Sequence, residues 1–303
     1  MPTPQPGVFA QGTRDHYHLE FDLRPGAEEA AVADAVARLR ATGFASREAN
    51  LVIGFGSELW RRLAPDGCPG DAAPFPEIPG VPGTQHDLWV WAHGTGVDSL
   101  FEGARLVNAC LADVAHLAQD VRGFVYRGGR DLTGFEDGTE NPAVNDALDV
   151  ALIPAGHVGA GGTFAITQRW VHDLEGFEAL GVPEQEGVIG RTKLDSVELA
   201  DAVKPPTAHI ARVVIAEDGT ELEIYRRSAP YGNLGELGLY FVAFSCDPTR
   251  FEKMLRRMFD PSIDGLTDRL TDFTAPVTGS YYFVPSQDSL QGLGARPPCK
   301  WRT

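Results

Sequence analysis

The chain has 303 residues and is 43% hydrophobic, which suits one large domain or two ordinary ones with well-filled cores. Its formal net charge of −16 argues against nucleic acid as a partner, because nucleic-acid binders need a basic surface that neutralises phosphates. No stretch approaches the roughly 18 apolar residues of a membrane span, and the N-terminus lacks the pattern of a signal peptide. We therefore expect a soluble, cytoplasmic protein that neither enters a membrane nor is exported by itself.

The cysteines give no sign of a metal cluster or of a covalently attached cofactor. Four are scattered along the chain without CxxC spacing: Cys68, Cys110, Cys246 and Cys299. This spacing excludes the usual zinc, iron–sulfur and covalent c-type haem signatures. Reduced thiols are the simplest interpretation.

Hydrophobic periodicity predicts the elements of the first half of the chain. Between residues 15 and 23, Tyr17 and Leu19 alternate with His16 and His18, which is typical of a half-buried strand. The predicted elements are a strand at 15–23, a helix at 27–42 capped by Gly43, a strand at 51–55, a short helix near Leu59, a loop at 65–83, a strand at 88–92, a helix at 97–118 and a strand at 121–126. Without the short helix the order is βαββαβ.

The same order is predicted a second time. Its elements are a strand at 162–171, a helix from Asp173, strands near 221–226 and at 237–245, a helix at 248–259 and a strand at 281–284. A repeated βαββαβ order predicts an α+β fold made of two ferredoxin-like halves. Strand and helix signals lapse at 142–162, so we place the boundary near residue 150, between halves 1–150 and 151–303.

Between the halves lies the loop GFEDGTENP, residues 134–142. Two glycines bracket Phe-Glu-Asp and permit unusual backbone angles, and they leave the Asp137 carboxylate on a stiff turn. Acidic DG turns are common, so the residues alone leave both a functional site and an ordinary turn open.

This loop resembles the GxxDG signature of dye-decolourising peroxidases. The likeness extends over most of the chain, through PQPGVFAQGTRDHYHLEF, QRWVHDL, VIGRTKLD, AHIARVVI and RRSAPYG. The length and short loops resemble the compact bacterial B-type branch. The resemblance implies a single chain of the dimeric α/β-barrel type, with one non-covalent haem b between sheet and helices. The N-terminal half ends in the GxxDG loop, and the C-terminal half carries the haem ligand.

The resemblance implies that His209 is the axial ligand of the haem iron and that Asp272 is the carboxylate behind it. The residues alone do not select His209 among eight histidines. Its ordinary interpretation is a capping or packed histidine at the start of a strand at 210–215, and that of Asp272 is an exposed aspartate at a helix end.

On the peroxide side, the resemblance implies Asp137, Arg226 and Ser228. The family pattern Arg-x-Ser/Asn-x-Pro-aromatic-Gly fits RRSAPYG only when Arg226 is its first member. Strand alternation then sends Arg227 to the opposite face, as a solvated or domain-bridging charge. Ser228 takes the small polar position, where it could assist proton transfer.

The implied activity is that of a haem b peroxidase. Such an enzyme reduces hydrogen peroxide via an oxyferryl porphyrin-radical intermediate and oxidises dyes, phenols or similar one-electron donors. Asp137 would shuttle a proton while Arg226 stabilises charge on the leaving oxygen, and which of the two dominates is left open. A pKa of Asp137 depressed by Arg226 would favour activity under acidic conditions.

The remaining predictions concern the surroundings of the haem. Arg226 and Arg191 are candidates for holding the propionates, and residues 239–244 for covering the ring. Aromatic residues that could relay electrons, or simply pack the core, are Trp170, Tyr225, Tyr240, Tyr281 and Tyr282. We expect a homo-oligomer, with an encapsulating shell protein as a further partner if the tail at 288–303 is a docking peptide and not a frayed terminus.

Two other functions stay open at this point. One is a haem-handling protein, such as a deferrochelatase or a haem carrier, although the charged Asp137–Arg226 pair argues against a mere carrier. The other is a ferredoxin-like structural protein without a cofactor, which would leave the GFEDGTENP and RRSAPYG likeness unexplained.

Overall fold

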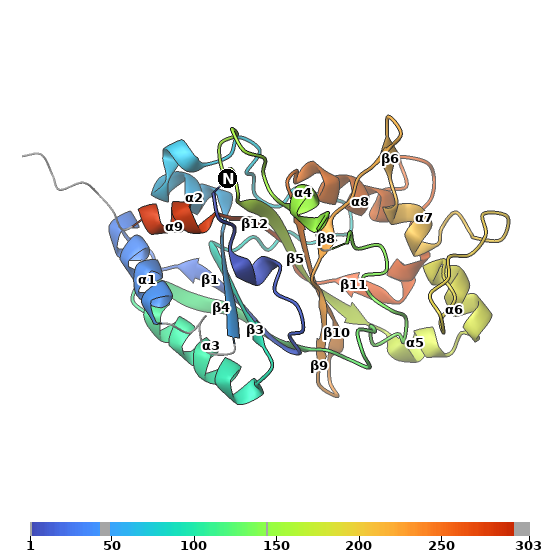
Figure 1. Ribbon diagram of the computed structural model, residues 1–303. Helices are drawn as coiled ribbons and strands as arrows, with labels where there is room; N and C mark the ends of the chain where they lie inside the picture. The colour runs from blue at the N-terminus through green and yellow to red at the C-terminus, as the bar shows by residue number, and fades with distance from the viewer. Residues whose placement is uncertain (1, 43–48, 144, 294–303) are drawn as a thin grey trace, which may run out of the picture.

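A computed structural model describes residues 2–42, 49–143 and 145–293 (Figure 1). Within these ranges, ten strands form one sheet: β1 (Asp15–Leu23), β2 (Ala49–Phe55), β3 (Leu88–Gly94), β4 (Ala115–Phe124), β5 (Thr163–His172), β8 (Tyr225–Arg226), β9 (Ala229–Gly232), β10 (Leu237–Ser245), β11 (Thr274–Pro276) and β12 (Ser280–Val284). A separate hairpin consists of β6 (Ala216–Glu217) and β7 (Thr220–Glu221). The helices are α1 (Glu29–Ala41), α2 (Ser57–Leu63), α3 (Val97–Leu111), α4 (Ala147–Ala151), α5 (Leu174–Glu178), α6 (Val182–Ile189), α7 (His209–Val213), α8 (Thr249–Phe259) and α9 (Gln287–Gly292).

Each half of the chain has the strand order of a ferredoxin-like unit. The first half is ordered β4-β1-β3-β2 and the second β12-β5-β10-β9, and the pairings are antiparallel. This order is the one that a βαββαβ chain produces when both helices cross the same face of the sheet. The predicted α+β class and the repeated order are confirmed.

The two halves meet at two places and form a closed ring of strands. β12 pairs with β2, and β4 pairs with β9, while β5 and β10 are paired within the second half. Every strand of the ring therefore has one face toward an interior and one face outward.

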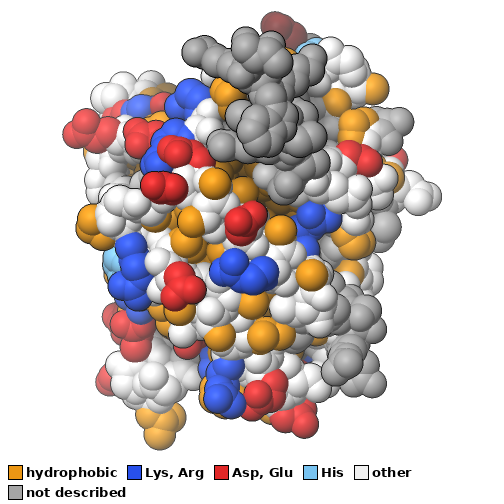
Figure 2. All heavy atoms as spheres, turned by 90° about the vertical axis from the view of Figure 1, so that its left-hand side faces the viewer, with side chains coloured by type: hydrophobic (Ala, Val, Ile, Leu, Met, Phe, Trp, Pro, Cys, Tyr) orange, Lys and Arg blue, Asp and Glu red, His pale blue; other side chains and the backbone are white. Residues whose placement is uncertain are grey.

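Two hydrophobic cores follow from this closure. The outer faces of the first half pack under α1 and α3, and Tyr17, Leu19 and Phe21 contribute to this core. The interior of the ring holds a second core of mainly aromatic side chains: Trp89, Trp91, Tyr231, Tyr240, Phe244 and Tyr282. The surface over α1 and α3 carries acidic and basic side chains interspersed with single apolar ones (Figure 2).

β1 is not half-buried as predicted. His16, His18 and Glu20 are no more than 5% exposed, because their face points into the closed ring and not into solvent. Alternation of polar and apolar residues correctly identified the strand, but it could not distinguish a polar interior from water.

Two element predictions are wrong in extent or type. The helix predicted at 97–118 ends at Leu111, and β4 begins at Ala115 because residues 115–117 pair with the end of β1. Long-range pairing overrides the helical periodicity there. The strand predicted at 210–215 is helix α7. The predicted cap Gly43 lies outside the described residues.

The cysteine prediction is confirmed in part. Cys68, Cys110 and Cys246 are free thiols, while Cys299 lies outside the described residues. In the ranges that the structure covers, no helix is long and apolar enough to cross a membrane.

Candidate active site

A large cavity lies against the outer face of the sheet in the second half of the chain. The space between its walls amounts to about 1480 Å³, the open solvent at its mouth included. Strands β5 and β10 form one wall, α7 and α8 another, and the loop 131–140 closes it. Most of the lining is apolar and includes Ile166, Leu239, Phe241, Phe251, Leu255 and Met258.

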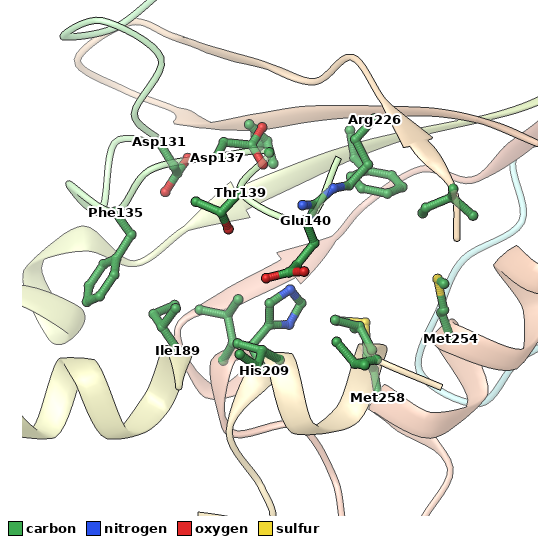
Figure 3. Close-up of a pocket in the computed structure, with 18 of the residues that line it drawn as sticks. Asp131, Phe135, Asp137, Thr139, Glu140, Ile189, His209, Arg226, Met254 and Met258 are labelled. Atoms are coloured by element: carbon green, nitrogen blue, oxygen red, sulfur yellow. The ribbon is translucent and has the colours of Figure 1, made fainter. Parts of the chain in front are cut away.

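Figure 3 shows the polar residues that face each other across this cavity. Asp137 and Arg226 lie on one side and His209 on the other, with Glu140 reaching between them. The cavity therefore brings together the three residues on which the family resemblance depended.

His209 is the first residue of α7, and a buried carboxylate fixes its ring. Nδ1 lies 2.6 Å from Oδ2 of Asp268, which is fully buried. Because an ionised carboxylate only accepts hydrogen bonds, Nδ1 carries the proton and donates. Nε2 then bears the free lone pair, and no residue of the described ranges forms a hydrogen bond with it. The imidazole is held in the tautomer that can bind a metal ion from the cavity.

Asp268, and not Asp272, is the carboxylate behind His209. Asp268 caps the 3-10 helix Arg269–Asp272, where its Oδ1 accepts a hydrogen bond from the Leu270 amide at 2.9 Å. Asp272 stands at the other end of this single turn and is exposed. The available sequence signal was the cap position itself, since aspartate is preferred immediately before the first turn of a helix.

The GFEDGTENP loop has the unusual backbone angles that its glycines permit. Gly134 has φ +88° and Gly138 has φ +81°, which are left-handed values that favour glycine. A Cβ added at Gly134 would also lie 2.8 Å from Cε of Lys193. The turn that presents Asp137 therefore requires these two glycines.

Asn141, at the end of the same loop, joins it to the strand that carries Arg226. Its Nδ2 donates to the Arg226 carbonyl at 2.8 Å, and its Oδ1 accepts from the Arg226 amide at 2.8 Å. The side-chain amide of Asn141 thus forms with Arg226 the same two hydrogen bonds that a neighbouring strand would form. It thereby sets the position of Asp137 relative to Arg226. The sequence predicts only a loop residue at Asn141, since asparagine is common in turns.

The electrostatics of Asp137 differ from the prediction. Burial raises the pKa of Asp137 above its ordinary value, although the positive charge of Arg226 opposes the shift. The negative charge of Asp131 also raises it. The expectation of a depressed pKa is therefore wrong, because removing the carboxylate from water outweighs the attraction of one guanidinium.

Arg226 and Arg227 point to opposite faces of β8 and its extension, as alternation predicted. Arg226 lines the cavity, whereas Arg227 enters the ring and donates to the carbonyls of Val8 at 2.7 Å and Ala10 at 2.6 Å. Its guanidinium also lies 5.2 Å from the ring centre of Trp91. Of the two roles considered for Arg227, the bridging charge is confirmed and the solvated one is wrong.

Ser228 and Arg191 do not both lie free in the main cavity. Ser228 lines a smaller cavity that adjoins the first and shares Asp137 and Arg226 with it, and its Oγ accepts from the Val242 amide at 3.3 Å. Arg191 lines the main cavity, where it pairs with Glu140 and donates to the Ser196 carbonyl at 2.7 Å.

The segment 239–244 divides between the two faces of β10. Leu239 and Phe241 line the cavity, while Tyr240, Val242 and Phe244 point into the ring. Only alternate residues of this segment can therefore cover a ligand in the cavity.

Two family models match almost the whole chain. The model of the N-terminal part of Dyp-type peroxidases matches residues 5–125, and the model of the C-terminal part matches residues 128–289. The two matches meet between β4 and the GFEDGTENP loop.

Individual relatives agree with this match. A dye-decolorizing peroxidase of Mycolicibacterium paratuberculosis is 38% identical, covering 98% of this chain and 90% of the relative. That of Mycobacterium tuberculosis is 39% identical over 86% of this chain and 82% of its own length.

Solved structures show the same fold. DyPB from Rhodococcus jostii RHA1 superimposes with a TM-score of 0.90 at 36% identity, covering 97% of this chain and 99% of that one. A variant of the same protein, solved in complex with heme, has a TM-score of 0.90 at 35% identity and covers 97% and 99% of the two chains.

Proposed function

This chain belongs to the Dyp-type peroxidase family, and we propose that it reduces hydrogen peroxide at a haem b bound between His209 and the Asp137–Arg226 pair. It is a haem-dependent peroxidase, and the relatives named dye-decolorizing peroxidases indicate one-electron donors such as dyes or phenols as reducing substrates. The observation that carries the site assignment is the placement of one oriented imidazole opposite a charged pair across a single large cavity.

The cavity suits a haem. The apolar lining is what a macrocycle requires, and the free Nε2 of His209 is a ligand that haem iron accepts. When bound, the haem supplies the iron that takes up peroxide and accepts its oxidising equivalents.

On the His209 side, the Asp268 carboxylate would make the imidazole more basic and hold it in one orientation. With haem bound, an imidazole held in this way would be the residue that supplies electron density to the iron. We assign no role of this kind to Asp272.

On the opposite side, Asp137 would accept a proton from the bound peroxide and return it to the oxygen that leaves as water. A raised pKa suits a group that must both take and release this proton. Arg226, which remains charged, would stabilise the negative charge that develops on the leaving oxygen. Ser228, in the adjoining cavity, would help to order a water on the proton route.

The propionates need cationic partners, and Arg226 and Arg191 are the candidates that line the cavity. Arg191 is already paired with Glu140, so it would have to exchange this partner for a propionate. Arg226 would then serve both peroxide chemistry and haem binding.

The predictions about higher organisation stay proposals. We propose two units of a dimeric α/β-barrel divided near residue 150, which lies in α4. We also propose a cytoplasmic location, which suits the free thiols. The likeness to DyPB supports the B-type branch. A homo-oligomer and packaging into a shell protein stay predictions, since residues 294–303 of the tail lie outside the described ranges.

The site assignment is tested by mixing the haem-loaded protein with hydrogen peroxide and following haem absorbance by stopped flow. We expect Arg226→Leu to slow the absorbance change by roughly 10²–10³-fold, the usual effect of removing a group that stabilises transition-state charge. It should also move the acid limb of the pH–rate profile to higher pH, because the Arg226 charge lowers the pKa of Asp137.

His209→Ala tests the opposite wall, where the loss of axial coordination should change the Soret band. Wild-type rates in Arg226→Leu would contradict the peroxide-side assignment, and unchanged coordination in His209→Ala would contradict the ligand. A haem carrier, the alternative function, would bind haem normally but show no absorbance change with peroxide.

A further inference from the structure

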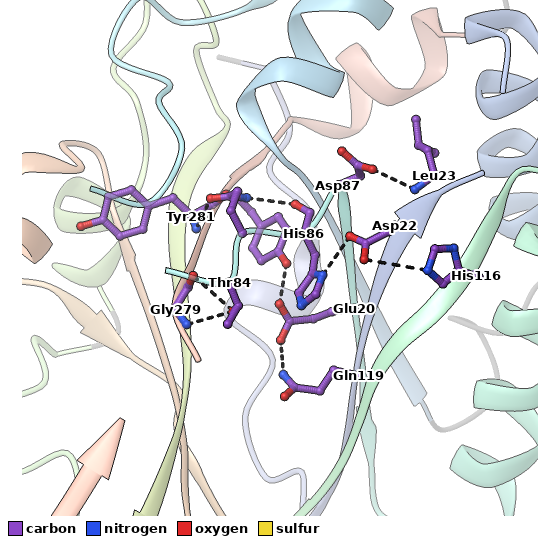
Figure 4. A network of polar contacts seen from close by, with 12 residues as sticks. Glu20, Asp22, Leu23, Thr84, His86, Asp87, His116, Gln119, Gly279 and Tyr281 are labelled. Carbon is purple, nitrogen blue, oxygen red and sulfur yellow. Dashed lines mark hydrogen bonds and ion pairs between the residues drawn. The ribbon is translucent and has the colours of Figure 1, made fainter. Parts of the chain in front are cut away.

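A carboxylate is buried inside the ring of strands, away from the cavity. Glu20 of β1 is 1% exposed, and three side chains donate to it: Tyr240 at 2.6 Å, Tyr282 at 2.5 Å and Gln119 at 2.5 Å. Figure 4 shows the Glu20–Gln119 contact near the end of the ring, where Asp22 and His86 also lie. Both tyrosines are no more than 2% exposed.

Such a group is costly to bury. Removing a carboxylate from water is energetically unfavourable, and apolar side chains of similar size would fill the same space. The peroxide site does not use Glu20, because it points into the ring. Its two tyrosine partners come from β10 and β12, so three segments far apart in sequence converge on one carboxylate.

The two phenols are poised to lose a proton together with an electron. Burial, followed by the nearby Glu20 charge, raises the pKa of both Tyr240 and Tyr282 well above the ordinary value, so both keep their protons in the resting protein. A phenol that loses an electron becomes a strong acid, and each phenolic proton already points at an acceptor oxygen.

An uncharged ring stacks on each of the two phenols. The ring of His18 lies 4.0 Å from that of Tyr240, and Trp89 lies 5.8 Å from Tyr282. Burial lowers the pKa of His18 well below its ordinary value, so its imidazole is neutral.

One strand separates this cluster from the haem cavity. Leu239 and Phe241 of β10 line the cavity, and Tyr240 between them points to the other face of the same strand. Among the described residues, Tyr240 and the cavity thus lie on the two faces of one strand, and an electron that passes between them crosses β10.

We propose that Tyr240, Tyr282 and Glu20 form a buried redox site that takes an oxidising equivalent from the haem. The inference rests on the proposed peroxidase function, which supplies the oxidant. One tyrosine gives one electron to the peroxide-oxidised haem, and its O–H bond breaks as the proton moves to Glu20. The products are a neutral tyrosyl radical and a neutral Glu20 carboxylic acid. An external one-electron donor such as a phenol then restores the tyrosine, and Glu20 returns the proton.

The test is electron paramagnetic resonance of the haem-loaded protein, freeze-quenched after mixing with hydrogen peroxide in the absence of reducing substrate. We expect a tyrosyl radical signal in the wild type and its loss in the double variant Tyr240→Phe/Tyr282→Phe. Glu20→Gln keeps the shape but removes the base, so it should slow radical formation by roughly 100-fold, the lower end of what a positioned base contributes.

Tyr281→Phe is the matched control. Tyr281 is the neighbour of Tyr282 on β12, is also buried, and points to the outer core, where its hydroxyl has no hydrogen-bond partner among the described residues. The signal should persist in this variant. Absorbance of the Soret band and thermal melting establish that each variant is folded and haem-loaded.

Two results would overturn the inference: a radical that survives in the double variant, or one that disappears in Tyr281→Phe. If the wild-type haem reacts with peroxide but no tyrosyl radical forms, this inference alone fails. If the haem does not react with peroxide at all, the proposed function fails first, and the two failures are thereby distinguished.

Discussion

At the scale of single residues, the site depends on which of two chemically equivalent carboxylates reaches the ring of His209. Asp268 and Asp272 have the same side chain and stand four positions apart on a single turn. Only Asp268 is buried against the ring of His209, because capping the turn points its carboxylate inward. The resemblance correctly led to this segment but not to the right aspartate, since the choice depends on the backbone direction of one turn.

Asp268→Asn tests this assignment. Asparagine retains the cap but removes the charge behind His209, so we expect haem affinity to fall by roughly 10–100-fold, the usual effect of losing such a partner. Titration of the apoprotein with haem, followed by absorbance, measures the change. Asp272→Asn is the control and should leave the affinity unchanged. Equal effects of both substitutions would speak against a special role for Asp268.

At the scale of elements, hydrophobic periodicity identifies most helices and strands, but pairing between distant strands sets where some of them begin and end. The residues that were predicted as the last turns of a helix at 97–118 belong to β4, because their backbone pairs with β1. Alternation correctly separated Arg226 from Arg227, since it is a property of the strand itself. The contact between the GFEDGTENP loop and β8 could not be predicted from periodicity, because it joins residues 85 positions apart.

Asn141→Ala tests that contact. The two backbone groups of Arg226 would lose their partners, and we expect the reaction with peroxide to slow and the loop at 134–141 to exchange its amide hydrogens faster. Hydrogen exchange and stopped-flow absorbance measure the two effects. Asn145→Ala, an exposed asparagine four positions later, should change neither. If loop exchange is unaltered in Asn141→Ala, the side chain does not hold the loop.

At the scale of the whole molecule, closure of the ring creates an interior that the polar residues of β1 must occupy. Burial lowers the pKa of His16 to about 3, and burial together with the charge of Arg227 lowers that of His93 to about 2. His18 shifts in the same direction. The folded protein therefore holds these histidines neutral under conditions in which an unfolded chain would protonate them.

This arrangement predicts acid sensitivity. Below the unfolded histidine pKa of about 6.5, the unfolded chain binds protons that the folded chain cannot, so stability present above that pH is lost as the pH falls toward 3. Each such histidine contributes a slope of roughly 1.4 kcal/mol per pH unit to the free energy of unfolding. Urea denaturation at a series of pH values between 7 and 4 measures it.

His18→Phe should reduce this slope by one histidine's share, because phenylalanine keeps the stacking on Tyr240 but does not titrate. A slope that is the same in wild type and His18→Phe would show that the ring interior does not govern acid stability.

The sequence by itself determined the α+β class, the repeated βαββαβ order and, through its resemblance to one family, the peroxidase function. These follow from local periodicity and from short motifs, which are properties of neighbouring residues. Only the tertiary structure decided that β1 is buried on both faces, that Asp268 supports His209 and that burial raises the pKa of Asp137. Each of these depends on what lies across the fold, because burial and hydrogen-bond partners are set by segments far apart in the chain.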